Sequence, residues 1–158
     1  MKRFLTYEEM TDLLDKQIPY INSLKYDEIV AVVRGGLTAA HYIAKQVRLP
    51  VGVFYPANDE NEARLILAKK STKRILIVED LVAEGRTYKE IFTFMKGQQL
   101  SWNFLPVLVD SKYETNFHLQ CLKTSDWIVF PYENYDKMNE GDRGLFRNKT
   151  DSYGVTNG

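Results

Sequence analysis

Residues 75–87 read Ile75-Leu76-Ile77-Val78-Glu79-Asp80-Leu81-Val82-Ala83-Glu84-Gly85-Arg86-Thr87. The four apolar residues that open this stretch predict a strand buried on both faces, which is typical of a parallel sheet. Two adjacent acids follow, and a loop with Gly85 then leads into a helix predicted over residues 87–96. The stretch therefore predicts a strand, a turn and a helix, with two carboxylates and a helix N-terminus at the turn.

The same order of elements occurs earlier in the chain. Residues 28–33 are rich in β-branched side chains, Arg34-Gly35-Gly36 interrupts them, and residues 37–47 have a helical pattern. A capping box at Thr6 predicts a first helix to about residue 18. Further apolar runs predict strands at 51–55, 104–109 and 127–130, and a strand or ribbon at 63–68. This alternation predicts an α/β fold, doubly wound around a mainly parallel central sheet, with ligands at the carboxyl ends of its strands.

Length and composition favour one globular domain that handles a small solute. The 158 residues are predicted to form a single domain, with 141–158 as a flexible tail. The 21 basic and 21 acidic residues cancel, which argues against nucleic acid or a membrane as the partner. One cysteine, Cys121, and two histidines are too few for a disulfide or a zinc site, and the N-terminus has no apolar signal segment. We expect a cytoplasmic protein.

The turn after residues 75–78 carries the clearest chemical signal. Adjacent acids suit the cis hydroxyls of a ribose, and backbone N–H groups at a helix N-terminus suit a phosphate. The pattern resembles the phosphoribosyl pyrophosphate (PRPP) motif of type I phosphoribosyltransferases: four apolar residues, two acids, two apolar residues and a small-residue loop that ends on threonine. The resemblance implies that Glu79 and Asp80 hold the ribose and that the 5-phosphate is bound by Ala83, Glu84, Gly85, Arg86 and Thr87. The structural alternative is that the two acids only cap the helix.

Arg34-Gly35-Gly36 lies about 45 residues upstream and resembles the pyrophosphate loop of the same family. Glycines let a ligand approach the backbone, and Arg34 adds a cation for phosphate. The resemblance implies that Arg34 and Gly35 bind pyrophosphate, that Arg34 also assists catalysis, and that a non-proline cis peptide is often present in this loop. Lys70 is a further pyrophosphate candidate, although a solvated basic face explains it equally well. Residues 56–62 fall where the family has a flexible hood, which is short here.

A third pattern concerns the base. Lys112 follows the strand predicted at 104–109, and Trp127-Ile128-Val129-Phe130-Pro131-Tyr132-Glu133 comes later. This resembles the xanthine, guanine and hypoxanthine branch of the family. There the lysine donates to the 6-oxo group and an aromatic side chain stacks on the purine, which implies base contacts by Lys112, Trp127 and Ile128. A surface role for Lys112 and a core role for Trp127 are the alternatives.

The resemblance also implies a reaction and a metal. We expect Mg²⁺-dependent displacement of pyrophosphate from PRPP by a nucleobase, with Asp80 and Glu133 as metal contacts, in a homodimer or homotetramer. Two residues depart from the family pattern. Ala83 stands where many 6-oxopurine enzymes have an aspartate, and Glu84 where a small residue is usual. These departures leave two alternatives open: a catalytically weak regulator that senses PRPP or a nucleotide, and a transferase for another base.

Overall fold

The computed structural model describes residues 1–115 and 117–133, and the predicted tail at 141–158 lies outside them. The chain divides into two compact units, one of residues Glu8–Ser125 and one of Met1–Tyr7 with Asp126–Gly158. Whether 1–158 behaves as one domain stays a prediction.

A six-stranded sheet forms the centre of the larger unit, in the order β4-β3-β2-β5-β6-β7. All neighbouring strands in it are parallel except β3 and β4. This confirms the predicted mainly parallel sheet. The strands are β2 (Glu28–Val32), β3 (Val51–Tyr55), β4 (Arg64–Ile66), β5 (Arg74–Val82), β6 (Ser101–Asp110) and β7 (Leu122–Thr124).

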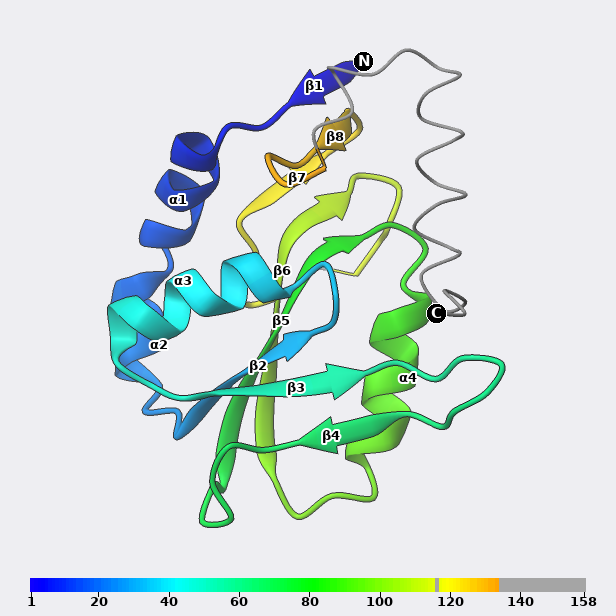
Figure 1. Ribbon diagram of the computed structural model, residues 1–158. Coiled ribbons are helices and arrows are strands. Elements are labelled where there is room, and N and C mark those ends of the chain that lie inside the picture. The colour runs from blue at the N-terminus through cyan, green and yellow to red at the C-terminus, as the bar shows by residue number, and fades with distance from the viewer. Residues whose placement is uncertain (116, 134–158) are drawn as a thin grey trace, which may run out of the picture. The chain divides into compact units, whose positions relative to one another are not determined.

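Two helical crossovers leave the centre of this sheet in opposite directions. The first runs from β2 through α3 (Leu37–Val47) to β3, and the second from β5 through α4 (Arg86–Met95) to β6. Because such crossovers are right-handed, α3 and α4 cover opposite faces of the sheet (Figure 1). The carboxyl ends of the adjacent strands β2 and β5 therefore form the switch point at which doubly wound sheets bind ligands.

Apolar side chains on both faces of β2 and β5 form the core. Val30 and Val32 alternate along β2 and so point to one face, where Ile91 and Met95 of α4 pack. On β5, residues Ile75–Val78 are all fully buried. This continuous burial is the reason that the apolar run predicts a central strand.

The first predicted helix is present but ends before residue 18, and a second helix that was not predicted follows it. α1 spans Tyr7–Asp15 and α2 spans Ile18–Ser23, with Pro19 in the first turn of α2. Proline has no N–H to donate, so it fits the first turn of a helix but not its interior. No helix among residues 1–115 and 117–133 is long and apolar enough to cross a membrane.

β5 also differs from its prediction, because it continues beyond Val78 to Val82. Its ladder with β6 pairs Glu79 with Pro106 and Leu81 with Leu108. The two acids thus belong to the strand itself, and only the loop from Ala83 to Gly85 separates it from α4.

The smaller unit contains a two-stranded parallel sheet of β1 (Lys2–Phe4) and β8 (Trp127–Val129). The strand predicted at 127–130 is therefore present, while β1 was not predicted. The Met1 amino group lies 3.2 Å from Asp126, which ties the start of the chain to the residue before β8.

A buried carboxylate holds the connection between β4 and β5. Glu28 is fully buried at the start of β2. It accepts hydrogen bonds from Ala68 N at 2.7 Å, Lys69 N at 3.3 Å and Thr72 Oγ1 at 2.8 Å. A Cβ on Gly52 would overlap Oε2 of Glu28, so glycine makes room for the carboxylate on the neighbouring strand. Because the donors come from the connection itself, Glu28 fixes it at the amino-terminal end of the sheet.

We expect Glu28→Gln to lower the free energy of unfolding by about 2–3 kcal/mol, because the amide of a fully buried side chain cannot satisfy the same three donors as the carboxylate does. The measurement is urea unfolding followed by circular dichroism. Glu62→Gln, an exposed change in the β3–β4 turn, serves as control and should shift stability by less than about 0.5 kcal/mol. Equal stability of the two variants would show that the Glu28 hydrogen bonds contribute nothing.

Candidate active site at the carboxyl ends of β2 and β5

The turn after β2 lies directly against β5. A Cβ on Gly35 would lie 2.5 Å from Cγ of Asp80, and one on Gly36 would lie 2.8 Å from the Val32 carbonyl oxygen and overlap that of Val78. Real Cβ atoms do not come so close, so only glycine fits at both positions. The structure thus brings the predicted pyrophosphate loop and the second acid of the predicted PRPP motif into contact.

The peptide bond between Val33 and Arg34 is cis, as the family resemblance predicts. The turn continues into α3, with Gly36 as its N-cap, and the Gly36 N–H donates to the Val32 carbonyl oxygen at 2.8 Å. The Arg34 side chain is exposed. Its guanidinium is therefore open to an anion at this edge of the sheet.

The two acids of the motif have different surroundings. Glu79 is 7% exposed and lines a pocket, whereas Asp80 is half-buried and faces Gly35. Burial, together with a hydrogen bond and the negative charge of Asp80, raises the pKa of Glu79 well above that of an ordinary carboxyl. The Asp80 N–H partly offsets this by donating to Oε1 of Glu79 at 3.1 Å. The pair therefore disfavours a second negative charge in the absence of a ligand.

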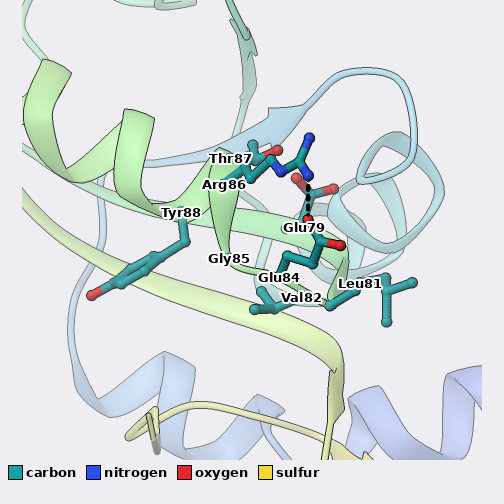
Figure 2. Close-up of a pocket in the computed structure, with 9 residues that line it drawn as sticks. Glu79, Leu81, Val82, Glu84, Gly85, Arg86, Thr87 and Tyr88 are labelled. Carbon is teal, nitrogen blue, oxygen red and sulfur yellow. Dashed lines mark ion pairs between the residues drawn. The ribbon is translucent and has the colours of Figure 1, made fainter. Parts of the chain in front are cut away.

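The loop between β5 and α4 forms one wall of a pocket of about 360 Å³. Gly85 is the N-cap of α4 and has φ of 74°, a left-handed conformation that favours glycine. The first N–H groups of an α-helix have no acceptor within the helix, so those of α4 are available to an anion. Figure 2 shows the pocket, whose lining residues are Glu79, Leu81, Val82, Ala83, Glu84, Gly85, Arg86, Thr87 and Tyr88.

Glu84 and Arg86 form an ion pair across this loop. Their side chains point toward each other in Figure 2, with Arg86 Nη2 2.6 Å from Glu84 Oε2. Both side chains are highly exposed, at 71% and 86%, so the pair adds little to stability. The pair places a guanidinium against the carboxylate that departs from the family pattern, and whether it compensates that charge toward a phosphate stays a prediction.

The two predicted lysines lie at opposite ends of the sheet. Lys112 is exposed two residues beyond β6. Because β6 is parallel to β5, Lys112 lies at the same edge of the sheet as Asp80 and the loop of residues 83–85. Lys70 instead lies in the connection that Glu28 holds at the amino-terminal ends of the strands. The structure does not bring Lys70 to the other site residues, and its pyrophosphate role stays an untested prediction.

A further cation, Arg64, was missed by the sequence interpretation. It pairs with Tyr55 at the carboxyl end of β3, and its guanidinium lies 4.7 Å from the centre of the Tyr55 ring. The sequence feature that could have indicated this position is the polar turn before Arg64. That turn reverses the chain direction, so Arg64 lies at the edge of the sheet formed by the carboxyl ends of β2, β3 and β5.

The predicted hood is a compact turn between β3 and β4. The Asn58 side chain closes it by accepting from Glu60 N at 2.9 Å and Asn61 N at 2.8 Å. Ala57 N donates to Oε1 of Glu90 on α4 at 2.6 Å. The turn is thus tied to α4, the helix that follows the loop of residues 83–85.

The remaining predicted residues belong to the smaller unit. Trp127 is 71% exposed on β8, next to half-buried Ile128. Glu133 accepts from Phe130 N at 2.8 Å, and the Phe130 ring stacks on Tyr132. The high exposure of Trp127 disagrees with the alternative in which it is a core residue. Base binding by Trp127 and Ile128, and metal binding by Glu133, stay predictions.

The family can now be assigned. The model of the phosphoribosyl transferase domain family matches residues 7–133. The chain belongs to this family. The match includes the turn at Arg34, the acids on β5 and the loop before α4, which are the elements that form the candidate site. A search of curated proteins gave no match.

Solved structures of phosphoribosyltransferases share the fold. A purine phosphoribosyltransferase from Pyrococcus horikoshii matches with a TM-score of 0.74 at 21% identity, over 88% of this chain and 99% of its own. The xanthine-guanine-hypoxanthine phosphoribosyltransferase of Helicobacter pylori has a TM-score of 0.73 at 19% identity, over 87% and 97%. A hypothetical protein from Neisseria gonorrhoeae with bound ppGpp has a TM-score of 0.69 at 13% identity, over 87% and 93%. Adenine and orotate phosphoribosyltransferases also match, at 0.59 and 0.55.

If Glu84 and Arg86 compensate each other, only the loss of Arg86 should weaken PRPP binding. We expect Glu84→Thr to leave the affinity unchanged or to tighten it up to roughly tenfold, because a carboxylate near the phosphate is removed. Arg86→Ala should weaken it, because Glu84 then faces the phosphate alone, and the double variant should recover most of the loss. Calorimetric titration with PRPP measures all three, with Glu8→Thr on α1 as control. Undetectable binding by the parent, restored by Glu84→Thr, would contradict the compensation.

Proposed function

We propose that this phosphoribosyltransferase moves the ribose 5-phosphate of PRPP to a ring nitrogen of a 6-oxopurine and releases pyrophosphate. The observation that carries the proposal is the contact between Gly35 and Asp80 at the switch point of the sheet. It joins a glycine turn suited to pyrophosphate to an acid suited to ribose hydroxyls, one loop away from a helix N-terminus suited to the 5-phosphate.

The proposed reaction is a displacement at C1 of the ribose. The bond from C1 to the base nitrogen forms, the bond from C1 to the pyrophosphate oxygen breaks, and pyrophosphate leaves with the electron pair. Positive charge develops on the ribose in an oxocarbenium-like transition state. Arg34 would stabilise the departing anion, and the rest of the acceleration would come from holding both substrates in place. Ala83 has no carboxylate to take the proton of the base, so water would accept it.

We further propose that Mg²⁺ accompanies PRPP. Among residues 1–115 and 117–133, no group of three or more His, Cys, Asp and Glu side chains gathers to hold a metal. Asp80 at the edge of the sheet is the side chain that fits best. Mg²⁺ is commonly bound by one or two carboxylates together with substrate phosphates and waters, so such a sparse donor set suits it. The metal would supply charge neutralisation of the pyrophosphate.

Lys112 is the main support for a 6-oxopurine. Its ammonium group donates hydrogen bonds and accepts none, which favours a carbonyl over the amino group of adenine. Its backbone is fixed at the ligand edge by Asp110, whose Oδ1 accepts from Lys112 N at 2.8 Å. Trp127 and Ile128 are proposed to cover the purine ring.

The test is to incubate the protein with PRPP and Mg²⁺ and to follow pyrophosphate release with xanthine, guanine, hypoxanthine, adenine, orotate and uracil in turn. Release with one or more of the three 6-oxopurines is expected. Release with only adenine, orotate or uracil would contradict the base assignment. PRPP binding without release for any base would favour the regulator, an alternative for which the ppGpp-bound structural match is the supporting observation.

Asp80→Asn should lower turnover by roughly 10²-fold or more with little effect on folding, because it removes the charge aimed at the ribose and the metal. Steady-state pyrophosphate release and a thermal melt measure the two effects. The control is Asp12→Asn on the exposed side of α1, which should leave both unchanged. Near-normal turnover of a folded Asp80→Asn protein would remove Asp80 from the site.

Lys112→Ala should lower kcat/KM for the preferred 6-oxopurine by roughly 10- to 100-fold, the size of a lost charged hydrogen bond, and change PRPP binding little. The comparison uses kcat/KM for the base and calorimetry for PRPP. The matched control is Lys45→Ala. Lys45 is also exposed, and it lies near the end of α3, distant in sequence from the loop before α4 and from the loop after β6. An equal loss of kcat/KM for every base would show that Lys112 does not bind the 6-oxo group.

A further inference from the structure

The Tyr113 ring packs on Gly85, the N-cap of α4 in the proposed phosphate loop, residues 83–87. A Cβ on Gly85 would lie 2.5 Å from Oη and 2.6 Å from Cζ of Tyr113. The ring therefore occupies the space in which any side chain at position 85 would start. Tyr113 comes from the loop after β6, so two loops that are 28 residues apart in sequence meet at this contact.

Tyr113 also contacts an aromatic neighbour. Its ring is stacked on Phe117, with centroids 6.1 Å apart and planes at 4°. Phe117 in turn contacts Tyr88 edge-on, at 4.9 Å, and Phe104 at 5.4 Å. Tyr88 lies in the first turn of α4 and Phe104 on β6. The cluster of Tyr88, Phe104, Tyr113 and Phe117 thus clamps the loop after β6 to the start of α4.

The clamp includes the residue next to Lys112. Asp110 holds both positions, because its Oδ1 accepts from Lys112 N at 2.8 Å and its carbonyl oxygen accepts from Tyr113 N at 2.9 Å. The Lys112 backbone is therefore attached on one side to the end of β6 and on the other to a ring that rests on Gly85. Tyr113 thus connects the backbone of the Lys112 loop to the loop before α4.

We propose that Tyr113 is a positioning residue that sets the separation between the phosphate loop and Lys112, and thereby the base that the site selects. The inference rests on the proposed function, in which these two groups hold opposite ends of one nucleotide. A ribose joins the phosphate to the base, so both ends are bound together only if the loops keep a fixed spacing. A misplacement of roughly 1 Å can cost about 10²-fold in rate.

The readout is base discrimination, defined as the ratio of kcat/KM for the best base to that for the second-best base of the parent protein. Tyr113→Ala should lower this ratio roughly tenfold, because Lys112 is no longer held against the phosphate loop. Tyr113→Phe keeps the ring and should keep the ratio within about twofold. A residue that only stabilises the fold would lower the amount of active protein but leave this ratio unchanged.

Phe92→Ala is the matched control. Like Tyr113→Ala, it removes an aromatic ring. The Phe92 ring contacts Tyr88 at 6.3 Å and Trp102 at 6.1 Å, but Phe92 lies on the exposed side of α4, two turns beyond Gly85. It should lower thermal stability and leave base discrimination unchanged. An equal fall in discrimination for Phe92→Ala and Tyr113→Ala would overturn the inference.

Gly85→Ala tests the same contact from the opposite side, and it stays informative if Tyr113→Ala does not fold. The added methyl group displaces the Tyr113 ring, so discrimination should also fall. In the Tyr113→Ala background the same change should cost less, although the left-handed backbone still disfavours alanine. Unchanged base discrimination in a folded Gly85→Ala or Tyr113→Ala protein would overturn this inference and leave the proposed function intact. Absence of pyrophosphate release by the parent with every base would overturn the proposed function, and this inference with it.

Discussion

The close approach of the turn after β2 to β5 is the constraint on which the site depends. Gly35 leaves no space for a side chain beside Asp80, and Gly36 leaves none beside the backbone of Val78. Parallel pairing of β2 with β5 brings their carboxyl ends together, and the crossovers through α3 and α4 leave this point in opposite directions. A cationic turn and an acidic strand end can therefore face the same ligand.

The charge distribution follows from this geometry. Burial and the neighbouring Asp80 raise the pKa of Glu79, and this limits the negative charge at the end of β5. The exposed Arg34 precedes Gly35, which contacts Asp80, and the loop with the Glu84–Arg86 pair follows Asp80 in the chain. An anion with a phosphate at each end of a ribose fits this order of cation, acid and helix N-terminus.

The fold could be predicted from local patterns, because fully apolar runs such as Ile75–Val78 that alternate with helical patterns are typical of a parallel sheet covered on both faces. Three features depended on long-range pairing and were beyond such patterns. β5 continues through its acids because β6 extends the ladder, and β1 forms only because it pairs with β8 from the far end of the chain. Lys70 lies away from the predicted site because β4 reverses direction.

The packing of Tyr113 on Gly85 could not be predicted from the sequence of either loop alone. Proximity of Arg34, Asp80 and the phosphate loop was expected, whereas their binding roles stay predictions.

A crystal structure with PRPP and Mg²⁺ tests the central claim most directly. The account predicts that the pyrophosphate lies on Gly35 and Gly36, the ribose hydroxyls on Asp80, and the 5-phosphate on the N–H groups at the start of α4. PRPP bound in another part of the chain, or in the reverse direction with its 5-phosphate at Gly35, would contradict it.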